Sequence, residues 1–231
     1  MTTIGARLQA VQARIERAAR AAGRPPKDIR LVAVSKTFPA ETIRQGHEAG
    51  QHDFGENYLQ EAVGKIESLR DLLIDWHYIG PIQSNKTRQI AERFSWVHSV
   101  DRLKIGQRLS EGRPAALGPL DVCIQVNVSG EASKSGVAPG EAAALARELA
   151  RLPRLRLRGL MTVPEATADV AVQRSCFSFL RDLKDRIVAS GLPMDTLSMG
   201  MTDDLESAIA EGATMVRVGR AIFGERDKAR R

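Results

Sequence analysis

The sequence predicts an α/β protein folded as a single (β/α)8 barrel of the TIM type, preceded by an N-terminal helix. The chain has 231 residues, close to the ~250 residues that are usual for such a barrel. Eight short apolar runs alternate with longer amphipathic stretches, a pattern typical of a parallel sheet that closes on itself. Without an internal repeat, low-complexity tract or linker to divide it, we expect the chain to form one domain over residues 1–231.

The first predicted element is a helix within residues 1–23. Thr2 or Thr3 can cap its start, and Gly23 followed by a Pro-Pro pair ends it. Four arginines with few acids are also typical of organelle transit peptides, but the regular apolar spacing favours a structural helix. The residues that form this apolar stripe are Ile4, Leu8, Val11, Ile15, Ala18 and Ala22.

The first half of the barrel begins with an uninterrupted apolar run, which is typical of a buried parallel strand. Pro39 at a first turn and Gly50 at an end bound the helix that follows. The second strand is short and weak, and Gly80-Pro81 ends the third. The four strands are predicted at residues 31–35, 52–54, 76–79 and 96–100, and their helices at 39–50, 57–73, 84–94 and 101–111.

In the second half, acidic residues are expected to begin helices. Asp101 is placed to cap the helix at 101–111, and Asp203 with Glu206 has the spacing of a capping box. The remaining strands are predicted at residues 120–128, 156–160, 196–198 and 214–218, and the helices at 140–151, 168–190 and 203–211. Residues 225–231 are expected to form a frayed tail.

Composition and charge bear on partners and on location. A net charge of +6 raises the question of nucleic acid, but the arginines are scattered and aromatic residues make up only 4%. A basic surface is therefore favoured over a nucleic-acid interface. No apolar run approaches the ~20 residues of a membrane helix, and no secretory segment is evident, so we expect no membrane partner and a cytoplasmic location. Cys123 and Cys176 lack any CxxC or Cys/His cluster, so no metal site is expected.

Two glycine-containing loops are candidates for phosphate binding. In barrels of this type, the loops after the seventh and eighth strands often hold phosphate. Ser198 offers a hydroxyl, and Gly200 and Gly219 let the backbone approach a ligand. Arg220 adds a positive charge next to Gly219, and Arg217 alternates with two valines and so faces the opposite side of its strand. The alternatives are a merely well-capped helix and surface arginines, and they stay open.

Lys36 is the most informative single residue. It directly follows the first apolar strand and shares the parity of Val32 and Val34. A partly desolvated lysine near other cations has a lowered pKa, and the neutral amine attacks aldehydes. The alternative is a lysine that extends to solvent from the end of a strand. A lysine opposite phosphate-binding loops suits a phosphorylated aldehyde.

Eight segments of the chain resemble the YggS/PROSC family of pyridoxal 5′-phosphate (PLP) homeostasis proteins. They occur in order, at family spacing, across nearly the whole chain. The segments are residues 31–37 (LVAVSKT), 54–58 (FGENY) with 60–61 (QE), 76–80 (WHYIG), 83–86 (QSNK), 125–128 (QVNV) with 134–136 (KSG), 158–161 (RGLM), 197–201 (LSMGM) and 216–219 (VRVG).

The resemblance implies a barrel like the N-terminal domain of alanine racemase, with PLP bound as a Schiff base to Lys36. It also implies that Arg217 faces the pyridine nitrogen and that Asn57 lies near the cofactor. The phosphate contacts that it implies come from Ser198, Gly200 and Gly219. Many relatives carry Ser or Thr at position 220, where this chain has Arg220. Here a hydroxyl contact is lost, and the arginine either supplies charge or points to solvent.

The implied function is reversible PLP binding in vitamin B6 homeostasis, as a carrier or regulator with no catalytic residue. An arginine always donates, so the ring nitrogen stays unprotonated and is a poorer electron sink, although alanine racemase works with the same arrangement. Apo-forms of PLP enzymes are the expected recipients, and a monomer is expected. The alternatives are a PLP-dependent racemase-like enzyme with a small substrate and a barrel enzyme for phosphorylated metabolites.

Overall fold

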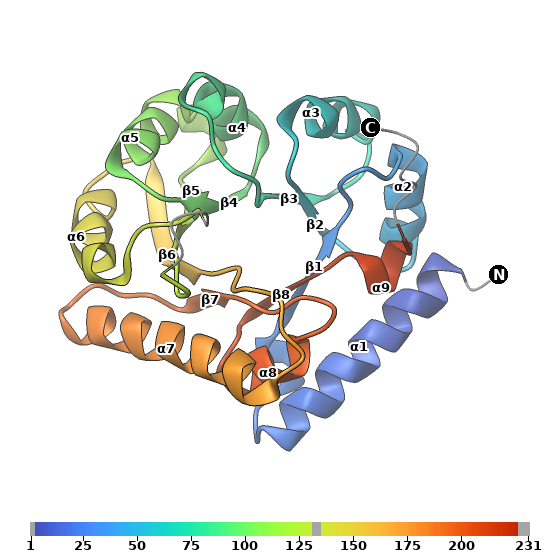
Figure 1. Cartoon of the computed structure of the whole chain (residues 1–231). Helices are drawn as coiled ribbons and strands as arrows, with labels where there is room; N and C mark the ends of the chain where they lie inside the picture. The colour runs from blue at the N-terminus through green and yellow to red at the C-terminus, as the bar shows by residue number, and fades with distance from the viewer. Residues whose placement is uncertain (1–2, 131–134, 226–231) are drawn as a thin grey trace.

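The computed structural model describes residues 3–130 and 135–225, which form a closed barrel of eight parallel strands in sequential order. Strand β1 pairs with both β2 and β8, and this pairing closes the barrel (Figure 1). The predicted fold class is confirmed; that residues 1–231 form one domain stays a prediction. The strands are β1 (Arg30–Val34), β2 (Asp53–Glu56), β3 (Asp75–Tyr78), β4 (Trp96–Val100), β5 (Leu120–Gln125), β6 (Leu155–Met161), β7 (Thr196–Ser198) and β8 (Met215–Val218).

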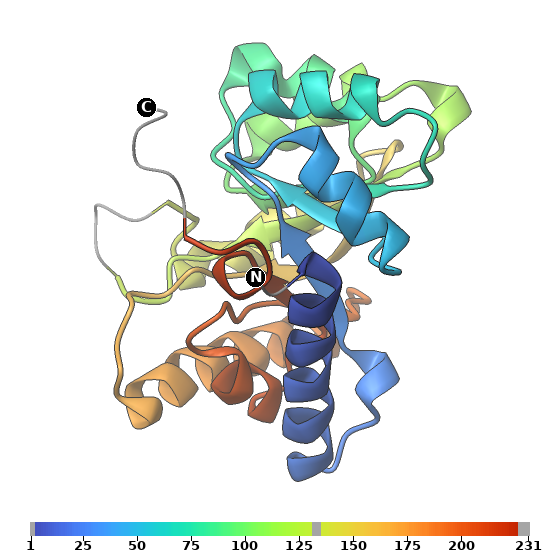
Figure 2. The same cartoon turned by 90° about the vertical axis from the view of Figure 1, so that its right-hand side faces the viewer.

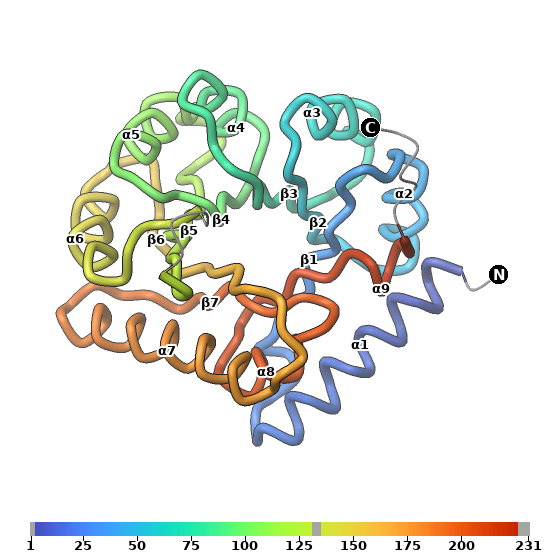
Figure 3. Tube along the Cα trace, in the orientation of Figure 1, coloured from blue at the N-terminus to red at the C-terminus, as the bar shows by residue number. Residues whose placement is uncertain are grey.

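The helices lie outside the strands, and each crossover returns the chain to the same end of the barrel, as the tube in Figure 3 shows. The α-helices are α1 (Ile4–Ala21), α2 (Ala40–Glu48), α3 (Leu59–Ser68), α4 (Thr87–Arg93), α5 (Leu103–Gly112), α6 (Pro139–Leu149), α7 (Val170–Ala189), α8 (Leu205–Ala210) and α9 (Arg220–Phe223). Short 3-10 helices η1 (Pro26–Asp28), η2 (Ser84–Lys86) and η3 (Ala115–Leu117) complete the described elements.

Helix α1 covers the side of the barrel where the neighbouring helices are short. Its start is capped as predicted, because Thr3 Oγ1 accepts a hydrogen bond of 3.2 Å from the N–H of Ala6. It packs against α2, α8 and α9 and runs along the outside of the barrel (Figures 1 and 2). Arg14 joins it to α8 by two hydrogen bonds of 2.9 Å to the carboxylate of Glu206. Ile15, at the centre of its apolar face, is fully buried.

The apolar core has two parts, and the strand parity separates them. The larger part fills the space between strands and helices, and Val216 and Val218 belong to it. Inside the barrel, a small cluster consists of Val32, Trp96, Cys123, Met161 and Met215. Other inward positions carry polar side chains, which is unusual for a barrel interior that branched apolar residues normally fill.

Two predicted helix caps are wrong, and helix α3 ends earlier than expected. Helix α5 begins at Leu103, and the carboxylate of Asp101 binds the guanidinium of Arg102 at 2.7 Å instead of a helix N–H. Helix α8 begins at Leu205, because both residues of the expected capping box pair with arginines elsewhere. Helix α3 ends at Ser68 rather than near residue 73. Of the expected tail at 225–231, residues 226–231 lie outside the described part of the chain.

Candidate functional site

The predicted site residues gather at the carboxyl end of four adjacent strands. Strands β7, β8, β1 and β2 are neighbours in the closed sheet and run parallel, so their carboxyl ends share one rim. Lys36 follows β1, Asn57 follows β2, Ser198 ends β7 and Arg217 lies near the end of β8. Gly219 follows β8, and a Cβ placed there would lie 3.1 Å from the carbonyl oxygen of Val34 at the end of β1. The closed sheet therefore brings this predicted set together on one rim.

The turn that carries Lys36 has a strained backbone. Lys36 is half-buried, and the next residue, Thr37, has a φ of 70°. Among the described residues, Thr37 is the one non-glycine residue with a positive φ, and this conformation is disfavoured for a β-branched side chain. The N–H of Thr37 donates a 2.6 Å hydrogen bond to Oε1 of Glu61 on α3. Side chains from α3 therefore hold the lysine turn in place.

A buried cluster of charged groups lies behind this turn. Lys65 Nζ donates to the carbonyl oxygen of Ser35 at 2.8 Å, to Oε1 of Glu56 at 2.7 Å, and to Glu61. The hydroxyl of Ser35 donates to the same Oε1 of Glu56 at 2.7 Å. Burial raises the pKa of Glu56, and the nearby ammonium of Lys65 opposes this effect. We call Ser35, Glu56, Glu61 and Lys65 the support cluster, because together they attach the lysine turn to α3.

Arg217 is buried just below the rim, and its side chain points into the barrel. It therefore faces the side opposite to its two valine neighbours, as the alternation along the strand predicted. Its Nη1 donates to the hydroxyl oxygen of Ser198 at 2.7 Å, and its Nη2 donates to the carbonyl oxygen of Thr162 at 2.8 Å. Burial lowers the pKa of Arg217 to about 10, so the guanidinium stays charged near neutral pH. Among the described residues, no acceptor binds its Nε–H.

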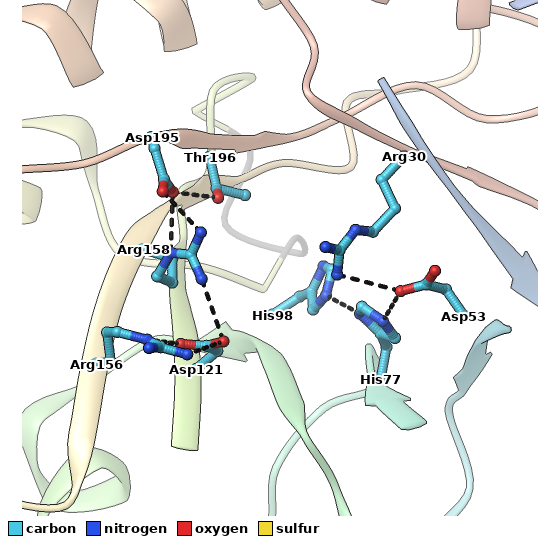
Figure 4. Close-up of polar contacts among 9 residues, drawn as sticks. All are labelled: Arg30, Asp53, His77, His98, Asp121, Arg156, Arg158, Asp195 and Thr196. Atoms are coloured by element: carbon cyan, nitrogen blue, oxygen red, sulfur yellow. Dashed lines mark hydrogen bonds and ion pairs between the residues drawn. The ribbon is translucent and has the colours of Figure 1, made fainter. Parts of the chain in front are cut away.

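Ser198 also begins a line of polar contacts that crosses the barrel interior. Its Oγ lies 2.7 Å from Nδ1 of His98, whose Nε2 lies 2.9 Å from Nδ1 of His77. Nε2 of His77 lies 2.9 Å from Oδ1 of Asp53, which also binds Arg30 at 3.2 Å (Figure 4). Both histidines are fully buried, and burial lowers the pKa of each, that of His98 most strongly.

The two loops predicted to hold phosphate are joined by an ion pair. Gly200 has a φ of 93°, and its carbonyl oxygen accepts a 2.9 Å hydrogen bond from the N–H of Arg217. Arg220 binds the carboxylate of Asp203, and about half of its side chain is exposed. The hydroxyl of Ser198 contacts Arg217 and His98, so a direct contact with phosphate would require one of these bonds to be exchanged. Both glycine loops still border the rim.

Two buried acceptors at this end of the barrel have no hydrogen-bond partner among the described residues. They are Oδ1 of Asn57 and Oε2 of Glu56. An unpaired buried acceptor costs about 1–3 kcal/mol, so such atoms call for a bound group that donates to them. With the amine of Lys36 and the cation of Arg217, Asn57 Oδ1 completes a set suited to a small anion that carries a reactive carbonyl.

Several of these residues were not selected from the sequence. His77, His98 and the charged members of the support cluster were not selected, although FGENY contains Glu56 and WHYIG contains His77. The available signal was a histidine at an inward position of an otherwise apolar strand, in residues 76–79 and in residues 96–100. A polar side chain at such a position needs a buried partner.

The amino end of the barrel carries a network of ion pairs. Arg158 lies with its guanidinium carbon 4.9 Å from the ring centre of Trp96 and binds both Asp121 and Asp195 (Figure 4). Arg156 also pairs with Asp121. Each of these two arginines is bound by a carboxylate, so we assign the network a structural role.

Neither a metal cluster nor a membrane helix is found in the described part of the chain. No group of three His, Cys, Asp or Glu side chains there is arranged to hold a metal ion. No helix within residues 3–130 and 135–225 is long and apolar enough to cross a bilayer.

Comparison with known proteins identifies the family. The model of the alanine racemase N-terminal domain matches residues 6–227. A pyridoxal phosphate homeostasis protein from Pseudomonas aeruginosa is 63% identical over 98% of this chain and 97% of its own length.

Solved structures agree with this match. PipY of Synechococcus elongatus, solved with PLP bound, is 37% identical, has a TM-score of 0.80, and is covered over 99% of its length and 91% of this chain. Alanine racemase from Clostridium difficile shares the fold, with a TM-score of 0.74 at 14% identity over 91% of this chain and 58% of the racemase. The chain belongs to the alanine racemase N-terminal domain family and, within it, to the family of the pyridoxal phosphate homeostasis proteins.

Proposed function

We propose that this protein binds PLP through Lys36 and acts in PLP homeostasis as a carrier or regulator rather than as a catalyst. The observation that carries the proposal is that half-buried Lys36, in the turn that follows β1, lies at the same rim as buried Arg217 on the adjacent strand β8. The name of the Pseudomonas relative and the PLP in the PipY structure support the cofactor. The covalent bond to a lysine amine can be hydrolysed, so one residue serves both storage and release.

The residues present fit PLP. The amine of Lys36 suits the aldehyde, and Nε–H of Arg217 suits an unprotonated ring nitrogen. The backbone at Gly200 and Gly219 borders the position proposed for the phosphate, and Arg220 adds charge nearby. The unpaired Oδ1 of Asn57 is an acceptor for a polar group of the ligand. We assign Ser198 to the support of Arg217 first, since its hydroxyl already binds the guanidinium.

Two arguments favour a carrier over an enzyme. The arginine that we propose at the ring nitrogen would weaken the cofactor as an electron sink, and a racemase needs acid and base groups on both faces of its substrate. Tyr58 is 53% exposed. Tyr78 donates its hydroxyl to the carbonyl oxygen of Pro81 at 3.1 Å, and burial raises its pKa. Neither tyrosine is placed as a buried acid or base at the rim.

A racemase-like enzyme is the second candidate, because the racemase shares this fold. It predicts exchange of the Cα hydrogen of common amino acids for deuterium when the PLP-loaded protein is incubated in D2O. The carrier predicts no exchange above that of the same concentration of free PLP. We place the carrier in the cytoplasm as a monomer, with apo-forms of PLP enzymes as recipients.

The cofactor proposal is tested by titration with PLP. The wild type and Lys104→Ala, a control at an exposed lysine, should develop a visible absorption band that Lys36→Ala lacks. Borohydride should then fix the added mass on the tryptic peptide that contains Lys36. Equal bands in Lys36→Ala and wild type would assign the cofactor to another amine, and the absence of a band in all three would refute PLP binding.

A further inference from the structure

A continuous line of hydrogen-bonding groups joins the two ends of the barrel interior. It runs from Asp53 at the start of β2 through His77 and His98 to Ser198 and Arg217, with four successive distances between 2.7 and 2.9 Å. The two histidines and Ser198 are fully buried, and Arg217 is 4% exposed. We call these five residues the interior chain; Figure 4 shows its Asp53–His77–His98 portion.

The position of every proton in this chain follows from Arg217. A guanidinium can only donate, so the oxygen of Ser198 accepts from Nη1. The hydrogen of Ser198 then goes to its other neighbour, Nδ1 of His98. A neutral His98 that accepts at Nδ1 carries its hydrogen on Nε2 and donates to Nδ1 of His77. His77 in turn carries its hydrogen on Nε2 and donates to Asp53.

The same order follows independently from the opposite end. The ionised carboxylate of Asp53 only accepts, so His77 donates from Nε2 and, if neutral, accepts at Nδ1. His98 then donates from Nε2 and accepts from Ser198. An extra proton on either imidazole would make Nδ1 of His98 a donor and leave the hydrogen of Ser198 without an acceptor. The geometry therefore selects two neutral histidines, both with the hydrogen on Nε2.

The interior chain also links the buried cation to a distant carboxylate, that of Asp53, in addition to the charge of Asp204, which acts on Arg217 through space. Among the described residues, no carboxylate binds Arg217 directly; its two bonds go to a hydroxyl and a carbonyl oxygen. Hydrogen bonds that all point the same way polarise one another. In this chain every donor points toward Asp53, so the oxygen of Ser198 carries added negative character beside the guanidinium.

We propose that His77 and His98 are positioning residues that hold Arg217, through Ser198, with its Nε–H directed at the ring nitrogen of the bound cofactor. Thr162 fixes the second branch of the guanidinium through its backbone carbonyl. With both Nη atoms bound, rotation of the guanidinium is restricted. The part of this inference that concerns the ring nitrogen rests on the proposed function, whereas the proton order does not.

The proton order is tested without cofactor. Nitrogen-15 NMR of the protein with labelled histidine separates the two neutral tautomers and the cation through their ring-nitrogen shifts. We expect His77 and His98, assigned with single substitutions, to be neutral with the hydrogen on Nε2 at about pH 7. A neutral ring with its hydrogen on Nδ1, or a doubly protonated ring, at either position would refute this proton order, whether or not the protein binds PLP.

The positioning role is tested with a pair of substitutions at one site. In His98→Asn, Oδ1 can replace Nδ1 as the acceptor for Ser198, whereas His98→Leu offers no acceptor. Without this acceptor, Ser198 no longer has a fixed orientation toward the charged guanidinium of Arg217, and loss of that charge-assisted contact should weaken PLP binding by about tenfold in His98→Leu. His98→Asn should restore most of this loss.

A PLP analogue with carbon in place of the ring nitrogen separates the positioning role from a general packing defect. The quantity measured is the ratio of the affinities for PLP and for the analogue, which a packing defect would leave unchanged. The wild type and His98→Asn should prefer PLP to this analogue, and in His98→Leu the preference should shrink toward one. An unchanged preference in a folded His98→Leu protein, checked by circular dichroism, would refute the positioning role. Failure of the wild type to bind PLP would instead refute the proposed function. The proton order of the interior chain would then be decided by the NMR experiment alone.

Discussion

The carboxylate of Glu61 accepts a 2.6 Å hydrogen bond from the backbone N–H of Thr37, the residue next to Lys36. Thr37 is held at a φ of 70°, a conformation that costs a β-branched residue about 1–3 kcal/mol. The same oxygen of Glu61 binds the buried ammonium of Lys65. The turn that presents Lys36 thus depends on a helix that begins more than twenty residues later.

Removal of this contact should loosen the lysine turn. In Glu61→Ala, Thr37 can relax to a negative φ, and the population with Lys36 directed inward should fall. We expect PLP affinity to drop by about tenfold, the effect of losing one hydrogen bond to a charged group. Absorbance titration measures it, with Glu67→Ala on the exposed face of α3 as the control. Equal affinities for the two variants would show that the turn holds its shape without Glu61.

Lys65 should be more important for stability than either of its carboxylate partners. Lys65→Met leaves Glu56 buried without a cation, and breaking such a buried pair costs about 3–5 kcal/mol of unfolding free energy. Urea unfolding near neutral pH measures the loss, and Lys104→Met, at an exposed site, should change little.

The loss in Lys65→Met should also depend on pH. Burial already raises the pKa of Glu56 in the folded protein, and without Lys65 it should rise further. Because the folded state then binds a proton more tightly than the unfolded state, the penalty is present above the raised pKa and is relieved as the pH falls. The difference from wild type should therefore shrink between about pH 7.5 and pH 5. A constant difference would mean that Glu56 stays ionised in the variant.

The two buried histidines should make the protein less stable in mild acid. Their pKa values are lowered in the folded state, whereas in the unfolded chain they titrate near 6.5. Below that value the unfolded state binds more protons, so the stability they contribute is present above about pH 6.5 and is lost as the pH falls, by up to about 1.4 kcal/mol per pH unit for each histidine.

Urea unfolding between about pH 7 and pH 5.5 measures this slope. His98→Asn removes one of the two groups and should lower the slope by up to one proton. His52→Gln, at an exposed histidine outside the interior chain, serves as the control. A wild-type slope no steeper than that of His98→Asn would contradict a neutral His98 in the folded protein.

The contact between β6 and β7 should tolerate no side chain at position 159. A Cβ on Gly159 would lie 1.8 Å from the carbonyl oxygen of Thr196, so the strands would have to separate. We expect Gly159→Ala to lose about 3 kcal/mol or more. Gly64→Ala, where a Cβ in α3 meets nothing within 4 Å, should gain about 0.5–1 kcal/mol from helix propensity. Thermal unfolding of the pair measures both effects, and a mild loss in Gly159→Ala would show that the strands can separate.

The alternation of apolar strands with amphipathic helices was sufficient to predict the barrel, and the alternation along β8 was sufficient to place Arg217 on the side opposite to its valine neighbours. Both predictions depend on the period of the sequence, which local residues determine by themselves. Helix starts were less predictable. Asp101 and Asp203 have good capping chemistry, but Asp101 binds the adjacent Arg102, and Asp203 binds Arg220, which follows it by 17 residues. The sequence pattern does not show which of several possible partners a carboxylate will bind.

The sequence by itself determined the fold class, the rim residues and the family resemblance. Only the tertiary structure decided which side chains are hydrogen-bonded to one another inside the barrel and behind the lysine turn. Ser198 and His98 lie 100 residues apart, and Glu61 reaches Thr37 across 24 residues. Such contacts arise from closure of the barrel, because the relative shift of paired strands decides which inward side chains share a level. That shift is a property of the whole sheet, and no single segment of the chain encodes it.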